Sequence, residues 1–259
     1  MKTSEESKLI SVVLPAFNCE KTVESAVMSV IAQTYENLEL IIVDDHSEDS
    51  TPEICRLLGE LDKRIRIITN ETNCGTLVSR AKAVNLSRGE WIGFIDADDL
   101  WHPEKLEKQL SLRNSTDCDL IYTASSFIDE NGKMYDWVMH VPEEVGYRRL
   151  LKQNIISNSS VLVRKTAYIR YAPADEKDND MHEDFACWLC MLRAGLIARG
   201  IDEPLITYRV SKKSTSGNKK KAAVMNMNTY KYIGLGFFER YFYEICYAFN
   251  GLIKYRHFR

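Results

Sequence analysis

Long apolar runs are missing from this chain of 259 residues, although 45% of its residues are hydrophobic. No stretch of about 20 uncharged apolar residues occurs, so we expect no membrane-spanning helix. The segment before Pro15 also lacks the apolar run that a secretory signal requires. These two absences predict a protein of the cytoplasm.

Glycine, proline and paired cysteines are also scarce. Twelve glycines and six prolines suit a folded domain with an ample core rather than a collagen-like or low-complexity chain. The seven cysteines are scattered and odd in number, which favours reduced thiols over a disulfide framework. Cys187 and Cys190 in "CWLC" could form a redox or zinc pair. Without a second Cys or His pair at ligand spacing, two faces of a packed helix are the favoured interpretation.

The common nucleotide-binding glycine motifs, GxGxxG and GxxxxGK[ST], are absent. Instead, short β-branched runs alternate with helical patterns. We predict strands over residues 9–15, 38–45, 64–69 and 91–95, and helices over 20–34, about 50–61, 75–89 and 102–112. This alternation is typical of an α/β fold with a mostly parallel, doubly wound sheet and helices on both faces.

The alternation is looser after residue 119. Residues 120–137 predict strands joined by a turn at Asn131 and Gly132. Further strands are predicted over 159–165 and 204–210, with a helix over 182–195 between them. We expect this half to supply the second wall of a cleft.

Carboxylates follow two of the predicted strands. Asp44 and Asp45 end the second, and Asp96, Asp98 and Asp99 come directly after the fourth. Ligands of doubly wound sheets bind beyond the carboxyl ends of the strands, so these groups should face one crevice. Their mutual repulsion predicts a bound cation, and oxygen ligands select Mg²⁺ or Mn²⁺, which complete their shell with substrate phosphates. The alternative is that Asp98 and Asp99 only complement the dipole of the following helix.

Several segments together resemble a known family. The segments "SVVLPAFNCEKTVESAVMSVIAQTYENLELIIVDDHSEDST", "NCG", "SRGEWIGFIDADDLWHPEKLEKQ" and "HEDFACWLCMLRAG" are similar to family 2 glycosyltransferases of the GT-A fold, of the bacterial surface-polysaccharide type. The resemblance implies a GT-A domain over 1–211. Its nucleotide-binding part would span about 8–118 and its acceptor part about 119–211, with a basic, aromatic-rich helical tail over 212–259.

The resemblance also implies a role for each matching position. The base and ribose of the nucleotide would be lined by Pro15, Ala16 and Phe17, with Asn18 and Glu20 nearby. Asp45 would hydrogen-bond a uracil-type base, Asp96 would meet the ribose or bridge toward the metal, and Asp98 would bind the metal. Asp184 would be the catalytic base. The acceptor region, or the layer directly behind the site, would contain Glu183, Asp99, Trp101 and Arg209.

The activity that the resemblance implies is transfer of a sugar, with inversion, from a UDP-sugar to an acceptor hydroxyl, with Mn²⁺ or Mg²⁺ as cofactor. The cation would stabilise charge on the departing diphosphate, and Asp184 would take the proton of the acceptor hydroxyl. Taken alone, "HED" predicts only an acidic helix start.

One position departs from the family pattern. Relatives often carry YRxH near the last strand, where this chain has Ser211, so a histidine metal ligand is not supported. Arg209, Lys212 or Lys213 could contact phosphate instead. His182 and His102 are predicted to be supporting or surface residues.

The tail differs from the body in charge. From Lys212 onward, ten lysines and arginines face two glutamates, a balance of +8, which leaves −11 on the rest of the chain. Aromatic residues interleaved with basic ones predict an amphipathic helix on an anionic membrane surface. The alternative is packing on the catalytic domain or on a second subunit of a homodimer. The acidic body argues against a nucleic-acid partner.

The resemblance implies a glycan acceptor linked to polyprenyl diphosphate and a peripheral position on the inner face of the plasma membrane. Two other functions fit the same cation site. A nucleotidyltransferase would not need a base opposite the sugar, and a non-catalytic nucleotide-sugar-binding scaffold would show no turnover.

Overall fold

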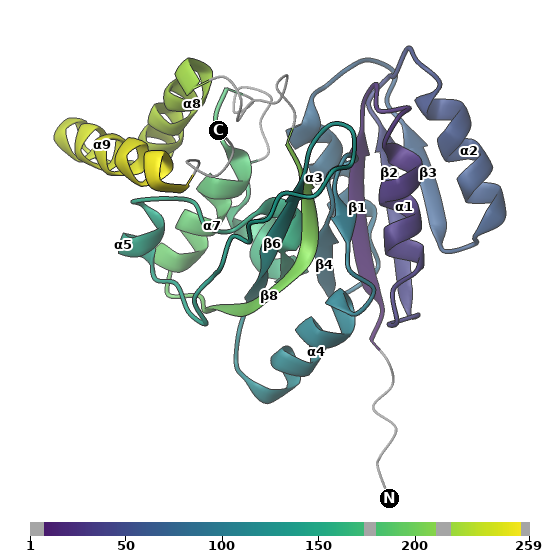
Figure 1. Cartoon of the computed structure of the whole chain (residues 1–259), viewed down its shortest axis with the longest axis horizontal. Helices are drawn as coiled ribbons and strands as arrows, with labels where there is room; N and C mark the ends of the chain where they lie inside the picture. Colours follow the sequence, from purple (N-terminus) through teal and green to yellow (C-terminus); the bar gives the residue numbers. More distant parts are fainter. Residues whose placement is uncertain (1–7, 174–179, 211–218, 255–259) are drawn as a thin grey trace, which may run out of the picture.

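The computed structural model describes residues 8–173, 180–210 and 219–254, which form one sheet covered by helices on both faces (Figure 1). The strands are β1 (Ile10–Ala16), β2 (Leu38–Asp44), β3 (Ile65–Thr69), β4 (Trp91–Phe94), β5 (Leu100–Trp101), β6 (Leu120–Ile128), β7 (Leu162–Arg164) and β8 (Ala198–Arg209). The helices are α1 (Val23–Ile31), α2 (Thr51–Leu61), α3 (Thr76–Leu86), α4 (Lys105–Ser115), α5 (Tyr147–Leu150), the 3₁₀ helix η1 (Asn158–Ser160), α6 (Lys165–Tyr171), α7 (Glu183–Arg193), α8 (Lys219–Tyr232) and α9 (Phe237–Lys254).

The strand order is β3-β2-β1-β4-β7-β6-β8-β5. The first four strands in this order are parallel to one another, and β6 is parallel to β8. Strands β7 and β5 are antiparallel to their neighbours. The predicted mostly parallel α/β sheet is therefore confirmed.

Alternate side chains of the central strands enter two separate cores, as the period of a strand requires. Val12 of β1 packs in one core with Val27 of α1. Its neighbour Val13 lies in the other with Val84 of α3 and Phe185 of α7. The near-continuous apolar runs of β1 and β2 reflect this burial on both faces.

The predicted strand over 159–165 is wrong in its first half. Residues 158–160 form η1, with Val161 N–H donating to the carbonyl of Asn158 at 3.1 Å, and only β7 pairs with neighbours. β7 pairs with two residues of β6 and three of β4, and the chain before it turns into η1 instead of continuing along β6. The turn at Asn131 and Gly132 is confirmed by a φ of +82° at Gly132. The returning chain then makes isolated bridges rather than a full strand.

Two other boundaries also differ from prediction, and some short elements are new. The helix expected from residue 20 begins at Val23, because the preceding loop is tied to the loop after β2 through the bond from Glu20 N–H to Asp49 Oδ2 at 3.1 Å. Strand β8 begins at Ala198 rather than 204, since residues 198–201 pair with β6 through backbone groups that an apolar pattern does not reveal. Helices α5 and α6 and strand β5 were not predicted.

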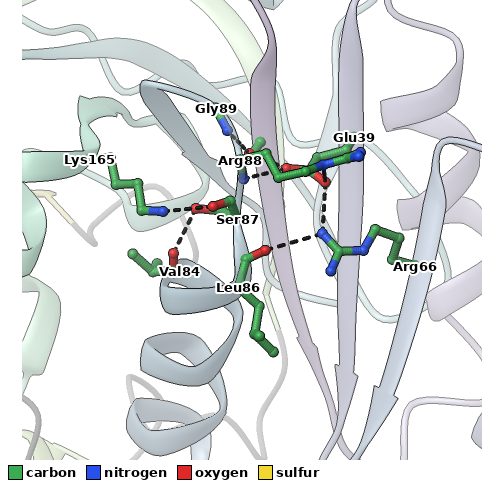
Figure 2. Close-up of polar contacts among 9 residues, drawn as sticks. Glu39, Arg66, Val84, Leu86, Ser87, Arg88, Gly89 and Lys165 are labelled. Carbon is green, nitrogen blue, oxygen red and sulfur yellow. Dashed lines mark hydrogen bonds and ion pairs between the residues drawn. The ribbon is translucent and has the colours of Figure 1, made fainter.

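A buried carboxylate fastens the amino-terminal ends of β1, β2 and β4 (Figure 2). Glu39 of β2 accepts hydrogen bonds from Ser11 Oγ at 2.7 Å and from the backbone N–H of Arg88 at 2.7 Å. Arg66 Nη1 and Arg88 Nε each lie 2.9 Å from its Oε2. Burial alone would raise the pKa of Glu39, but these donors lower it below its usual value. This network is at the opposite end of the strands from the polar loops.

The tail forms two helices, and the first packs on the body. Tyr230 of α8 is fully buried and donates to the carbonyl of Leu151 at 2.8 Å. Thr229 Oγ1 accepts the backbone N–H of His182 at 3.0 Å. Helix α9 then packs its Tyr243 and Tyr247 side against the same core. Among the described helices, none has the length and unbroken apolar composition needed to cross a bilayer.

Candidate active site

The loop that follows β4 carries the three carboxylates at different depths. Asp99 is fully buried, with Oδ1 accepting the backbone N–H of Arg209 at 3.0 Å and Oδ2 accepting the hydroxyl of Ser159 at 2.5 Å. Asp96 and Asp98 are half-buried. The loop is thus anchored through Asp99, which leaves the other two carboxylates for a ligand.

The two half-buried carboxylates suit a hard cation. Burial, and then the charge of Asp96, raise the pKa of Asp98 to about 6, so a positive ligand would stabilise this corner. Asn158 donates to Asp96 Oδ1 at 3.5 Å, while its own buried Oδ1 has no partner among the described residues. No group of three or more His, Cys, Asp or Glu residues within the described ranges could hold a metal by itself. A cation here would therefore need oxygen ligands from a substrate, as Mg²⁺ and Mn²⁺ sites commonly have.

Arg209, at the end of β8, holds the backbone of this loop. Its Nε donates to the carbonyl of Asp98 at 3.0 Å and its Nη1 to the carbonyl of Asp129 at 3.4 Å. Together with the backbone bond to Asp99, these contacts fix the loop to the carboxyl end of β8.

Trp101 lies in the interior behind the acidic loop, with 4% of its surface exposed. Its Nε1 donates to the carbonyl of Ser159 at 2.8 Å, and Lys105 Nζ lies 3.7 Å from the centre of a Trp101 ring. The indole fits against β4 because Gly93 has no side chain: a Cβ there would come within 2.8 Å of the ring. Trp101 thus supports η1 from behind.

Arg80 is a site residue that we did not predict. It projects from α3, is 4% exposed at its side chain, and pairs with Asp96 Oδ1 at 3.1 Å and with Glu183 Oε1. Burial acts to lower the pKa of Arg80, but the charges of Glu183 and Asp96 raise it overall, so the guanidinium stays charged. It therefore links the acidic loop after β4 to the start of α7.

A sequence signal for Arg80 did exist. Leu77, Ala83 and Val84 mark the buried face of α3, and Arg80 stands in the middle of that helical repeat. A charge at an apolar position of a periodic face predicts a buried ion that needs partners. For Ser159, by contrast, nothing distinguishes the hydroxyl from those of its serine neighbours.

Asp184 lies at the first turn of α7, beside the Arg80 pair. Burial, followed by the charge of Glu183, raises the pKa of Asp184 to about 7, against the opposing effect of Arg80. A carboxyl group with this pKa can accept a proton near neutrality. His182, which precedes the helix, is half-buried, and this burial lowers its pKa.

Asp45 organises the loop that follows β3. Its Oδ1 accepts from Asn70 Nδ2 at 2.7 Å and from the N–H of Cys74 at 2.9 Å, and its Oδ2 accepts the N–H of Gly75 at 2.7 Å. Burial would raise the pKa of Asp45, but these donors, with Ser79, lower it. The carboxylate is therefore ionised and shapes the entrance to α3.

The loop after β1 is tied to the loop after β2. The N–H of Asn18 donates to Ser47 Oγ at 3.0 Å, and Asn18, at a φ of 46°, accepts from Glu48 N–H through Oδ1 at 2.9 Å. Glu20 contacts the same neighbouring loop, where its Oε2 accepts Ser50 N–H at 3.1 Å. Phe17, in the loop directly after β1, is 48% exposed. Pro15 and Ala16 are the last residues of β1, directly before Phe17.

Other predicted positions lie elsewhere or outside the described ranges. His102 is exposed, and its carbonyl accepts from Gln33 Nε2 at 2.8 Å. Cys187 and Cys190 are free thiols on α7. Ser211, Lys212 and Lys213 fall outside the described residues.

Solved structures share this fold. TarS 1–349 of S. aureus in complex with UDP-GlcNAc matches with a TM-score of 0.67 and 17% identity, over 89% of this chain and 69% of that one. The mannosyltransferase PcManGT from Pyrobaculum calidifontis, in complex with GDP-Man and Mn²⁺, matches with a TM-score of 0.66 and 18% identity, over 88% and 64%. A longer TarS chain is matched over 37% of its length. The architecture is thus that of the GT-A class, as predicted.

Sequence comparison gives the family. The profile described as Glycosyl transferase family 2 matches residues 11–176. TuaG of Bacillus subtilis, whose name refers to teichuronic acid biosynthesis, is 34% identical over 95% of this chain and 97% of its own. WfaP of Escherichia coli, a UDP-Glc:alpha-D-GlcNAc-diphosphoundecaprenol beta-1,3-glucosyltransferase, is 33% identical over 95% of each chain. The chain belongs to glycosyltransferase family 2, and the predicted enzyme class is confirmed.

Proposed function

We propose that this glycosyltransferase moves a sugar from a UDP-sugar, with inversion, to a glycan on polyprenyl diphosphate during surface-polysaccharide synthesis. The observation that carries the proposal is the Arg80 link between Asp96 and Glu183, which sets Asp184 beside the acidic corner. The names of WfaP and TuaG support the donor, the lipid-linked acceptor and the polysaccharide pathway.

The donor would bind along the carboxyl ends of β1, β2 and β4. Phe17 has an exposed ring that can cover a base or ribose, between Pro15, Ala16 and the fixed loop of Asn18 and Glu20. Asp45 would meet the base with its ionised carboxylate while it holds the loop at Gly75. TarS 1–349 of S. aureus, which shares the fold, was solved in complex with UDP, and this supports a UDP-linked donor.

Asp98, with Asp96, would hold Mn²⁺ or Mg²⁺ on the diphosphate. When bound, such a cation stabilises the negative charge that develops on the leaving group. Asp99 and Arg209 keep the loop in place without contributing a ligand, because the Asp99 carboxylate is already taken by two donors.

Asp184 would act as the base on the acceptor side. It would remove the proton of the acceptor hydroxyl as that oxygen attacks the anomeric carbon from the side opposite the diphosphate, which inverts the centre. Glu183, held by Arg80, would fix the start of α7. Arg80 would also keep Asp96 oriented toward the donor.

A lipid-linked acceptor implies work at a membrane surface, which we place at the inner face of the plasma membrane, in the cytoplasm. Residues 8–118 would bind the donor and 119–211 the acceptor. The tail over 212–259 would bind the membrane surface, and its helix α8 also packs on α7. A homodimer is compatible with this arrangement.

The test is transfer from a panel of UDP-sugars to a synthetic polyprenyl-diphosphate GlcNAc acceptor with Mn²⁺ or Mg²⁺. We expect one donor to be used, with product loss in Asp98→Ala and in Asp184→Asn. Release of a nucleotidyl product that persists in Asp184→Asn would instead identify a nucleotidyltransferase. Tight UDP binding with no turnover on any donor or acceptor would identify a scaffold.

A further inference from the structure

The outer face of α9 is a continuous apolar surface. The large side chains on this face are between 51% and 85% exposed and comprise Phe237, Phe238, Tyr241, Phe242, Ile245 and Phe249. Their spacing of one, three and four residues places them on one side of the helix. Figure 1 shows α9 at the edge of the molecule, beyond α7 and α8 and far from β2 and β3. We call these six side chains the α9 face.

The acidic residues of α9 lie off this face. Glu239 Oε2 accepts the N–H of Gly236 at 2.8 Å at the start of the helix. Glu244 is half-buried beside Asn226 of α8, and burial raises its pKa to about 7. The neighbouring helix α8 carries exposed Lys220, Lys221 and Lys231, and the sequence of the tail has a balance of +8.

We propose that the α9 face inserts into the headgroup region of an anionic lipid bilayer. Aromatic rings next to lysines and arginines are the side chains that bind this region, and anionic lipids attract the basic surroundings. A second copy of the chain is the less favourable occupant. A two-fold contact through α9 would bring two tails of +8 together, and their mutual repulsion opposes it.

The α9 face is mechanically joined to the candidate base. Phe185 follows Asp184 on α7, and its ring centre lies 6.1 Å from that of Tyr230 on α8 and 5.9 Å from that of Tyr247 on α9. The bond from His182 N–H to Thr229 fixes the same junction. Docking of the face would therefore hold the start of α7 at a set height above the bilayer. This consequence rests on the proposed function, whereas lipid binding itself does not.

The test compares the full chain with a variant of the face and a matched variant elsewhere. The face variant is Phe238→Ser, Phe242→Ser and Ile245→Ser. The control is Leu61→Ser, Met134→Ser and Ile169→Ser, which replaces the same number of exposed apolar side chains away from α9. Flotation is measured with vesicles of phosphatidylcholine alone and with about one third phosphatidylglycerol, and self-association is measured by sedimentation.

We expect the wild type and the control to float with the phosphatidylglycerol vesicles, and the face variant to lose about tenfold or more of this binding. Equal flotation of the face variant would overturn the proposal. So would a wild-type dimer that the face variant dissociates while neither protein binds vesicles, a result that would assign the face to a second copy.

Activity separates this proposal from the proposed function. The face variant should keep transfer to a short-chain acceptor in solution and lose transfer to a long-chain acceptor embedded in vesicles. A wild type that floats but transfers no sugar would refute the enzymatic proposal and leave lipid binding standing. A wild type that is active in solution and does not float would refute only the lipid-binding face.

Discussion

The hydroxyl of Ser159 donates a 2.5 Å hydrogen bond to Oδ2 of Asp99, and both residues are fully shielded from solvent. The same hydroxyl oxygen accepts the backbone N–H of Asp96 at 3.1 Å. One side chain from η1 thus ties two points of the acidic loop together. The loop's other anchor is Arg209, whose N–H reaches the same carboxylate from β8.

Replacing Ser159 with alanine should loosen the acidic loop. The buried carboxylate would lose one of its two donors, and we expect a loss of about 1–3 kcal/mol in the free energy of unfolding. The concentration of Mn²⁺ needed for half-maximal transfer should also rise. Denaturant titration and a metal titration of activity measure the two effects.

Ser160→Ala is the matched control for that change. Its hydroxyl is equally buried but donates to the carbonyl of Ser157 at 2.7 Å and contacts no carboxylate of the site. The metal titration should therefore be unchanged. Equal shifts of the metal requirement in the two variants would show that Ser159 does not position the loop.

Asp184→Asn should remove the base without removing donor binding. We expect kcat to fall about 10²–10⁴-fold, the usual effect of a positioned base, while the KM for the UDP-sugar changes little. Steady-state kinetics at saturating acceptor measure this split. A variant with near wild-type kcat would exclude Asp184 as the base.

The pH dependence of the wild type follows from the same residue. Because the pKa of Asp184 is raised to about 7, kcat/KM should increase with pH and level off above that value.

The stability of the fold should change with pH in the opposite direction to kcat/KM. The folded state holds a proton that the unfolded chain releases above its lower pKa, so Asp184 destabilises the fold increasingly as pH rises from that lower pKa to about 7, and the loss levels off above 7. Asp184→Asn should lessen this loss, and thermal melts at pH 5 and pH 8, values on either side of the raised pKa, would show it. Identical melting profiles for the two proteins would contradict the assignment.

Arg80→Ala should reduce both stability and activity. It leaves Asp96 and Glu183 without their shared cation, and we expect a loss of about 2–3 kcal/mol, below the range for fully buried pairs because both carboxylates keep some water. Arg56→Ala is the control, since its pairs with Glu53 and Glu60 are exposed and should leave the unfolding midpoint unchanged. Similar midpoints for the two variants would contradict a role for Arg80 in the core.

Glu39→Gln should act on stability alone. The amide keeps the shape but loses the charge that faces Arg66 and Arg88, at a cost of about 2 kcal/mol. Because the pKa of Glu39 is lowered in the fold, its contribution is present above its unfolded value and is lost as pH falls below it. The stability difference between variant and wild type should thus shrink in acid, with kcat unchanged at neutral pH. A lowered kcat would show that this end of the sheet is coupled to the site.

The parts of the fold that sequence predicted well are those with local patterns. Strands β1, β2 and β4 are each a short run of consecutive buried residues, and the helices between them have apolar residues at helical spacing. The acidic loop was predictable because charge directly after a buried strand is itself a local feature. Strand β8 was predicted too short, because its first half is held by backbone pairing and not by an apolar pattern.

The sequence by itself determined the alternation of β1 to β4 with α1 to α4, the acidic loop after β4 and the charged tail, because each of these depends on neighbours along the chain. Only the tertiary structure decided which side chains from distant parts of the chain come into contact. Arg80 pairs with Glu183 across 103 positions, and Ser159 reaches Asp99 across 60. The direction in which α9 presents its apolar face likewise depends on packing against α7 and α8. Such contacts are selected by the packing of the whole sheet and its helices, for which no single segment holds the information.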